Sequence, residues 1–178
     1  MSRSKVRSIA EESIKETPDQ AVERWMDEYG DSLLRLCFMM MGDRGLAEDA
    51  VQEVFWRAYN KYHTYRADGS EQAWLSAIAM NYCRSQLRKA RLKPDNAASA
   101  LDSVPDVSSP EEKAGDTVIE AVMNLSSKYR ESILLYYYQG FKVREIALML
   151  HVPVATITAR LRRAREKLKN ELKEWYDE

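Results

Sequence analysis

The segment "KVREIALMLHVPVATITARLRRAREKLKNELKEW", Lys142 to Trp175, carries the clearest structural pattern in the chain. Its first part has apolar residues at the i, i+3, i+4, i+7 spacing of one helix face, namely Val143, Ile146, Ala147 and Leu150. The following "HVP" predicts a tight turn. A longer helix then begins near Val154, with basic residues mostly outside its apolar stripe of Ile157, Leu161, Ala164, Leu168 and Leu172. This order predicts a helix-turn-helix, whose second helix enters the major groove of DNA.

A helical hairpin with a merely solvated basic face is the alternative for this segment. Solvated faces mix Glu with Lys at i, i+4, whereas the stretch from Ala155 to Arg165 holds no acidic residue. Thr156 and Thr158 lie near the start of the second helix, where hydroxyls and backbone N–H groups can meet a phosphate or a base edge. The sequence therefore favours DNA contact.

The other periodic segments also indicate helices, and no convincing alternation of period 2 appears, so the predicted fold is all-α. Capping residues and glycines predict the helix ends. The expected helices are one from Thr17 and Pro18 to Gly30, one from Asp31 to Gly42, and one capped by Asp43 at about 46–62. After the loop "HTYRADGS" comes a fourth helix, and further helices are expected at 111–124 and from a Ser126 or Ser127 cap to Gly140.

Small, polar and proline residues without an apolar period make up "KPDNAASALDSVPDVSSP", from Lys93 to Pro110. This composition is typical of a linker rather than of a core element. We therefore predict two small helical domains, at 18–93 and 111–175, joined by a flexible linker at 94–110. The second is the helix-turn-helix domain.

The composition is that of a globular protein, with 178 residues and a hydrophobic content of 45%. No segment approaches the roughly 20 apolar residues of a membrane span, and the N-terminal residues lack the apolar part of a signal peptide. We therefore expect a cytoplasmic protein without membrane insertion. The net charge of -1 hides an acid-rich stretch at 11–53 and base-rich stretches at 84–93 and 160–169. Two separate cationic surfaces suggest two contacts with a polyanion.

Residues for catalysis or metal binding are sparse. Cys37 and Cys83 lie on different predicted helices without neighbours at zinc-site spacing, so we expect buried free thiols. His63 and His151 have no Ser, Cys or paired carboxylate placed for catalysis, so we expect them on the surface or in loops. The sequence predicts no enzyme activity, no metal and no cofactor.

A second unusual segment is "AWLSAIAMNYCRSQLRKARLK", Ala73 to Lys93, which begins like a buried helix and ends without an acidic residue. Cations beside aromatic side chains are typical of surfaces that follow a phosphate backbone and hold unpaired bases.

Three motifs, in this order, resemble the extracytoplasmic-function sigma factors, the compact two-domain members of the sigma-70 family. They are "AEDAVQEVFWRAY", "WLSAIAMNYCRSQLRK" and "RLRRAREKL", within about 19–172. The resemblance implies that the first domain docks on the clamp of core RNA polymerase and engages the promoter's -10 element as an unpaired strand. The second domain would read the -35 element as a duplex. It also implies an anti-sigma factor that holds such proteins inactive.

For polymerase binding, the family's D-x-x-Q-E-x-F pattern is matched by Asp49, Gln52, Glu53 and Phe55. On a helix the three polar residues share one exposed face, while Val51, Val54 and Phe55 face largely inward. An acidic face can meet a basic partner, although the same spacing also suits simple solvation.

For the -10 element, Asn81 matches the family's asparagine, and the candidate contacts are Asn81, Arg84, Arg88, Lys89 and Arg91. The family's W-L-x-x-I-A is matched by Trp74, Leu75, Ile78 and Ala79, which we expect in the core, whereas Tyr82 either stacks on a base or packs. The family often has an aromatic residue where this chain has Glu71, and an aspartate where it has Ser85. The -10 sequence preference therefore stays open.

For the -35 element, base readout is expected from Thr158, Arg162 and Arg163, and phosphate contact or packing from Thr156, Arg160 and Arg165. The family tends to have T-V-[KR]-[ST]-R where this chain has "TITAR", so Thr158 and Ala159 are departures. A few phosphate contacts per domain give weak, salt-sensitive binding, so we expect strong promoter binding only together with polymerase.

A stand-alone helix-turn-helix regulator, with a sensing or dimerisation domain at its N-terminus, is the rival interpretation. It explains the C-terminal half equally well. It does not explain a second acid-free cationic helix beside "DAVQEVF".

Overall fold

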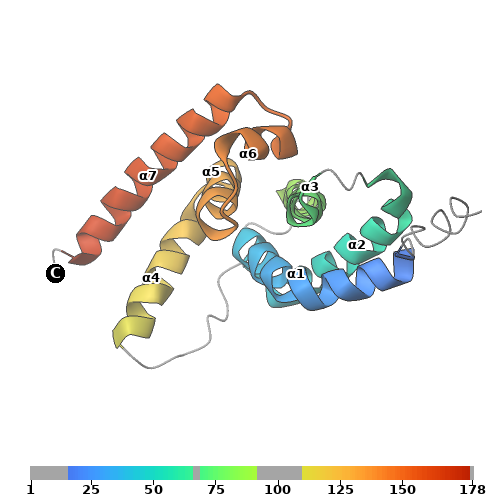
Figure 1. Cartoon of the computed structure of the whole chain (residues 1–178). Coiled ribbons are helices and arrows are strands. Elements are labelled where there is room, and N and C mark those ends of the chain that lie inside the picture. Colours follow the sequence, from blue (N-terminus) through green and yellow to red (C-terminus); the bar gives the residue numbers. More distant parts are fainter. Residues whose placement is uncertain (1–15, 66–68, 92–109, 177–178) are drawn as a thin grey trace, which may run out of the picture.

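The structure, a computed structural model, describes residues 16–65, 69–91 and 110–176, and the regular elements within these ranges are helical. Figure 1 shows two groups of helices, with α3 lying between the rest of the first group and α5 and α6 of the second. The first group contains α1 (Pro18–Met41), α2 (Arg44–Asn60), the 3-10 turn η1 (Tyr62–Thr64) and α3 (Glu71–Arg91). The second contains α4 (Pro110–Asn124), α5 (Ser127–Ile133), η2 (Leu134–Tyr138), α6 (Val143–Leu150) and α7 (Val154–Tyr176). The predicted all-α fold with two domains is confirmed.

Local sequence signals set several helix ends as predicted. Thr17 caps α1 in a capping box with Gln20, and the Asp43 carboxylate caps α2 by accepting a 2.7 Å hydrogen bond from the Leu46 backbone N–H. Gly42 ends α1 at a φ of 76°, in the left-handed region where a side chain is unfavourable. The predicted linker at 94–110, apart from Pro110, lies outside the described residues, as does the tail before residue 16.

Gly30 does not end a helix, contrary to the prediction, and α1 runs through it from Pro18 to Met41. A glycine inside a helix costs about 1 kcal/mol relative to alanine. The helix continues because residues on both sides of Gly30 belong to one core: Trp25, Leu33, Leu36 and Met40 are fully buried. The helix expected to reach Gly140 also differs, because its last part, η2, is a π-helix.

The core of the first domain is built around Trp25. Its indole is fully buried, and its ring centre lies 6.0 Å from that of Tyr62, 5.9 Å from that of Tyr65 and 5.5 Å from that of Trp74. Trp74 therefore packs in the core as predicted, together with the buried Leu75 and Ala79.

The two thiols and the two histidines lie where the sequence predicted. Cys37 of α1 and Cys83 of α3 are buried and free, and a hydrogen bond with the Cys37 thiol, together with burial, raises the pKa of Cys83. His63 and His151 are exposed. Within the described residues, no three potential ligands gather for a metal ion, and no helix is long and apolar enough to cross a membrane.

In the second domain, the predicted helix-turn-helix is formed by α6 and α7. Ile146 and Leu150 of α6 pack with Ile157, Leu161 and Ala164 of α7, so the apolar stripes read from the sequence are the buried faces. His151 ends α6 at a φ of 54°, and α7 begins after Pro153. A 3.0 Å hydrogen bond from Asn124 to Glu171 joins α4 to the far part of α7.

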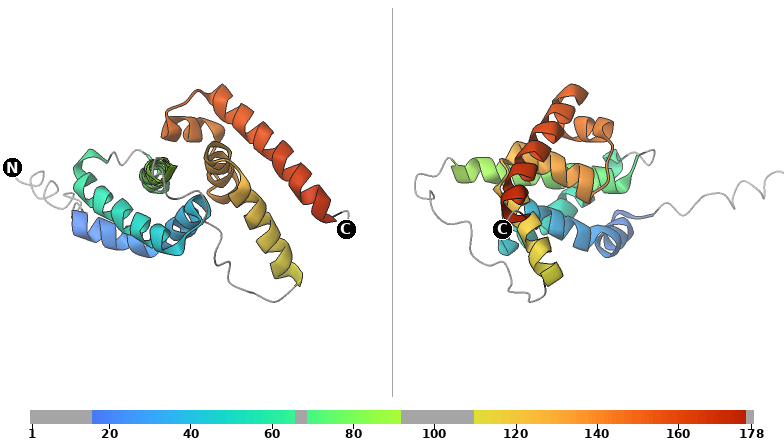
Figure 2. Two further views of the ribbon diagram at one scale, coloured as in Figure 1. Left: turned by 180° about the vertical axis from the view of Figure 1, so that it is seen from behind. Right: turned by 90° about the vertical axis from the view of Figure 1, so that its left-hand side faces the viewer.

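Polar contacts join the two domains. Gln139 accepts a 2.8 Å hydrogen bond from Gln72 of α3 and donates a 3.0 Å bond to Ser32 of α1. Arg130 donates a 2.7 Å bond to the Met40 carbonyl and further bonds to the carbonyls of Met123 and Leu125. Since Met40 lies in the last turn of α1, this cation satisfies carbonyls at the ends of two helices. Figure 2 shows this arrangement of the two groups of helices from behind and from the side.

A half-buried ion pair at the edge of the first domain gives a pH-dependent stability prediction. Arg24 donates 2.7 and 2.8 Å hydrogen bonds to the two carboxylate oxygens of Glu71, and these bonds lower the pKa of Glu71. Because the pKa of Glu71 is lower in the folded protein, its ionised form stabilises the fold at pH values above its ordinary pKa of 4.5. This stabilisation is lost as the pH falls through the folded-state pKa. Because Arg24 is 40% exposed, Glu71→Gln is expected to lower the unfolding free energy at pH 7 by only about 1 kcal/mol.

Urea unfolding of both proteins from pH 7 to pH 3 checks this, and the difference should shrink toward the acid end. Glu23→Gln, an exposed position on the same helix as Arg24, is the control, with an expected change within about 0.5 kcal/mol. A difference between wild type and Glu71→Gln that grows on acidification would contradict the assigned role of the pair.

Candidate protein and nucleic-acid interfaces

The outward face of α2 carries the polar residues of the predicted docking motif. Asp49 and Gln52 are exposed and Glu53 is half-buried, at the i, i+3, i+4 positions of one face. Glu53 accepts a 2.6 Å hydrogen bond from Arg57, whose guanidinium lies 5.3 Å from the ring centre of Tyr82 on α3. Tyr82 therefore lies beside α2, where it lines a shallow hollow together with Asp49, Gln52, Glu53 and Trp56.

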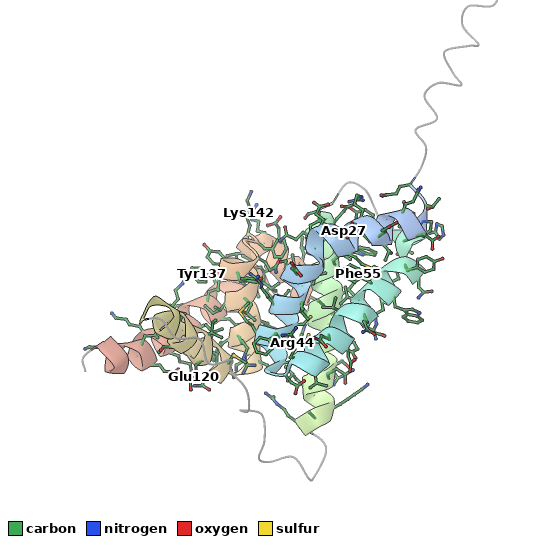
Figure 3. All side chains as sticks on the ribbon, turned by 90° about the horizontal axis from the view of Figure 1, so that it is seen from below. Asp27, Arg44, Phe55, Glu120, Tyr137 and Lys142 are labelled. Carbon is green, nitrogen blue, oxygen red and sulfur yellow. The ribbon has the colours of Figure 1, made fainter. Side chains whose placement is uncertain are left out.

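Phe55 and Trp56 are neighbours on α2 but differ sharply in exposure. Phe55 is 5% exposed and holds the helix against the core, so its side chain offers a partner almost no surface (Figure 3). Trp56 is 63% exposed beside the acidic residues. Large exposed aromatic side chains are typical anchors of protein interfaces. Sequence reasoning missed Trp56, although its spacing of four residues from Gln52 would have placed it on the same face.

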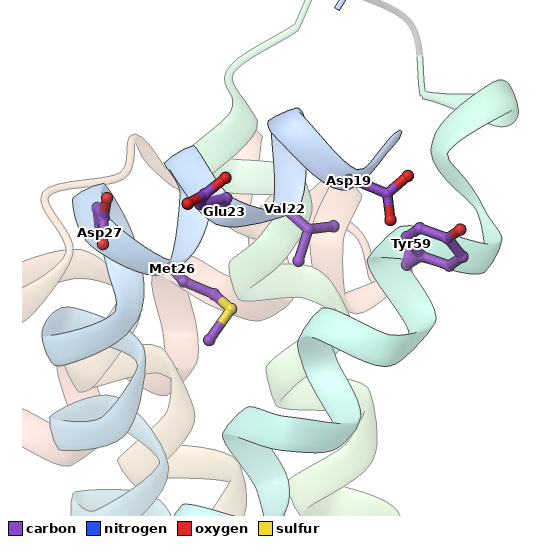
Figure 4. Close-up of a pocket in the computed structure, with 6 residues that line it drawn as sticks. All are labelled: Asp19, Val22, Glu23, Met26, Asp27 and Tyr59. Atoms are coloured by element: carbon purple, nitrogen blue, oxygen red, sulfur yellow. The ribbon is translucent and has the colours of Figure 1, made fainter. Parts of the chain in front are cut away.

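A second pocket lies between the N-terminal half of α1 and the C-terminal part of α2 (Figure 4). It is lined by Asp19, Val22, Glu23, Met26 and Asp27 of α1 and by Tyr59 of α2. Tyr59 follows Trp56 by three residues, which places both on one face of α2. Acidic side chains beside Val22 and the exposed Met26 match a partner with basic and apolar residues.

The C-terminal part of α3 holds the residues predicted for the -10 element. Asn81, Arg88, Lys89 and Arg91 are exposed, whereas Arg84 is half-buried and forms an ion pair with Glu131 of α5 at 3.4 Å. Arg91 lies 3.5 Å from the Ser127 hydroxyl at the start of α5. One part of this cationic row thus faces the second domain.

On α7, the residues predicted for the -35 element fall into two groups. Thr158, Arg162 and Arg163 are exposed, with the Thr158 hydroxyl donating to the Val154 carbonyl at 3.1 Å and Arg163 lowering the pKa of Tyr129 by a hydrogen bond. Thr156 and Arg160 are half-buried. Arg165 is exposed but lies over the rings of Tyr136 and Tyr137 and donates a 2.7 Å bond to the Tyr137 hydroxyl. The first group is therefore the more accessible to DNA.

Glu131 of α5 brings one residue from each predicted DNA surface together. Its side chain is 3% exposed, and it accepts a 2.8 Å hydrogen bond from Arg160 while its second oxygen faces Arg84. Burial raises the pKa of Glu131, and the two guanidinium groups oppose that increase. Glu131 was not among the predicted site residues, because a single glutamate in "KYRESILLYYYQG" gives no sign of its partners 47 and 29 positions away.

The fold is that of a two-domain helical protein with a helix-turn-helix in its second domain. Residues 25–93 match the family Sigma-70 region 2, and residues 116–168 match Sigma-70, region 4. The chain is 30% identical over 177 residues to the ECF RNA polymerase sigma factor SigW of Bacillus subtilis (strain 168), covering 90% of this chain and 94% of that protein. The chain belongs to the extracytoplasmic-function sigma factors of the sigma-70 family, whose members direct RNA polymerase in promoter recognition.

Two further comparisons agree with this family. The RNA polymerase sigma-H factor of Pseudomonas aeruginosa is 27% identical, covering 88% of this chain and 89% of that protein. The sigma factor RpoE of Bartonella quintana, solved in complex with the anti-sigma factor NepR, has a TM-score of 0.73 and 26% identity, covering 85% of this chain and 96% of that one. Sigma factors bind core RNA polymerase and are not enzymes. The family therefore decides against the stand-alone regulator and supports the prediction that the chain is no enzyme.

Proposed function

We propose that the chain docks on core RNA polymerase through the outward face of α2, with Asp49, Gln52, Glu53 and Trp56 as the contacting residues. The observation that carries this proposal is the exposure of Asp49, Gln52 and Trp56 on one face. The buried side chain of Phe55 packs beneath this face and holds α2 against the core. An acidic face with an exposed tryptophan suits a basic, partly apolar partner surface.

Promoter contacts are divided between the two domains in this proposal. Asn81, Arg84, Arg88, Lys89 and Arg91 of α3 hold the unpaired strand at the -10 element, where cations follow the phosphates. Thr158, Arg162 and Arg163 of α7 read the duplex at the -35 element, and Thr156, Arg160 and Arg165 hold phosphate or pack. The protein works with polymerase in the cytoplasm.

An anti-sigma factor is the proposed inhibitor. The relative from Bartonella quintana was solved with such a partner, and it covers 85% of this chain. A partner that covers the α2 face or keeps the α3 cations from DNA would prevent promoter binding.

Promoter selection from genomic DNA tests the proposal. Fragments bound and transcribed by the reconstituted holoenzyme are expected to share two short motifs at constant spacing, while the free chain binds the same fragments at least about 100-fold more weakly at physiological salt. A single duplex motif bound equally tightly without polymerase would instead support an autonomous regulator.

A further inference from the structure

The cleft between α3 and the second domain is strongly cationic. Among the described residues that line it are the cations Arg84, Arg88 and Arg91 of α3, Lys128 of α5 and Arg160 of α7, and a single acid, Glu131 of α5. Cations held this close repel one another unless a counter-charge lies between them. Glu131 supplies that charge, with one carboxylate oxygen toward Arg160 and the other toward Arg84.

Glu131 holds a residue of each domain at once. Arg160 lies in the same domain as Glu131 and binds one oxygen of its carboxylate at 2.8 Å. Arg84 lies in the first domain, and its guanidinium is 3.4 Å from the other carboxylate oxygen. Gln139 adds the hydrogen bonds to Gln72 and Ser32 across the same boundary. Polar contacts of this kind can be replaced by contacts with water, and relative motion of the domains within one chain is common.

We propose that Glu131 acts as an internal substitute for a DNA phosphate and holds the free chain closed. In this closed state Arg84 binds a carboxylate of its own chain and is withheld from the promoter. Separation of the two domains, for example when each docks on polymerase, breaks the contact between Arg84 and Glu131 and exposes Arg84 together with the cleft, while Arg160 keeps its bond to Glu131 within the second domain. The closed state rests on the observed contacts alone, and its effect on DNA rests on the proposed role of Arg84.

The first test measures closure without DNA. Spin labels on cysteines introduced at the exposed Asp27 of α1 and Glu166 of α7 report the distance between the domains in the full chain. The wild-type chain is expected to give one narrow distance population, and Glu131→Gln a broad or longer one, because the neutral amide leaves two facing cations unneutralised. Arg84→Gln removes the cation on the first-domain side of this contact, outside the packed core of α5. This variant should show the same change in the distance distribution.

Glu120→Gln is the matched control. It removes the same charge from an exposed position on α4 of the same domain, and its distance distribution should equal that of the wild-type chain. Circular dichroism shows whether each variant is folded. If the folded Glu131→Gln and Arg84→Gln chains both keep the wild-type distance, the proposed closure by Glu131 is overturned.

The second test measures binding of the free chain to a labelled duplex of mixed sequence at low salt. If more than nine tenths of wild-type molecules are closed, Glu131→Gln is expected to bind at least about tenfold more tightly than both the wild-type chain and Glu120→Gln. An open Glu131→Gln chain with unchanged DNA affinity would overturn the role given to Arg84, while leaving closure itself established by the distances.

Discussion

The combined variant Asp49→Ala, Gln52→Ala, Trp56→Ala is expected to bind core RNA polymerase at least about 100-fold more weakly than the wild-type chain. Hot-spot residues each contribute about 2 kcal/mol or more, and every 1.4 kcal/mol is about tenfold in affinity. Trp56 should carry the largest single share, because its 63% exposed indole loses the most water-accessible apolar surface on docking.

Titration of labelled chain with core polymerase measures this affinity. Asp31→Ala, which removes an exposed carboxylate from α1, is the control and should bind as the wild-type chain does. None of the three changed side chains is buried, so the variant should keep the wild-type unfolding transition. A folded variant with undiminished affinity would mean that the polymerase docks elsewhere, and the pocket at Asp19, Met26 and Tyr59 would be the next surface to test.

The second large effect is expected on α7. Changing Arg162 and Arg163 together to alanine should weaken binding of the holoenzyme to its selected promoter by about 100-fold, because each arginine contact with a base or phosphate is worth about 1–3 kcal/mol. The double variant should also show a smaller salt dependence, by up to about 0.9 in the log–log slope per lost phosphate contact.

Footprinting of the holoenzyme over a range of salt concentrations measures both quantities. The control changes Arg35 and Lys61, two exposed cations of the first domain, to alanine and so removes the same charge. Only the α7 variant should lose protection at the -35 element, and both should still bind core polymerase. Equal losses from the two double variants would show that net charge, and not the helix-turn-helix, determines promoter affinity.

Much of this protein follows from short-range sequence patterns. The apolar stripes of α6 and α7 are read from residues three and four positions apart, and that spacing is set by the helix itself. The caps at Thr17 and Asp43 and the αL glycine at Gly42 are equally local. The same spacing puts Asp49, Gln52 and Glu53 on one face and Phe55 on another.

Other features depended on which helices pack together. Gly30 has the local chemistry of a helix end, but burial of Trp25 and Leu33 on either side keeps α1 continuous. Trp56 has a large apolar side chain, yet this side chain is exposed in the fold. The core side of α2 is already filled by Val54, Phe55 and Ala58. Local sequence carries no information on how much of a helix its neighbours cover.

The sequence by itself determined the all-helical fold, the helix-turn-helix and the two cationic helices, since each depends on spacings of a few residues. Only the tertiary structure decided that Arg84 and Arg160 share the buried carboxylate of Glu131. That arrangement requires α3, α5 and α7 to meet, and three segments far apart in the chain meet only through the packing of both domains. An exposed cation and a paired cation therefore look identical in the sequence, although their availability to DNA differs.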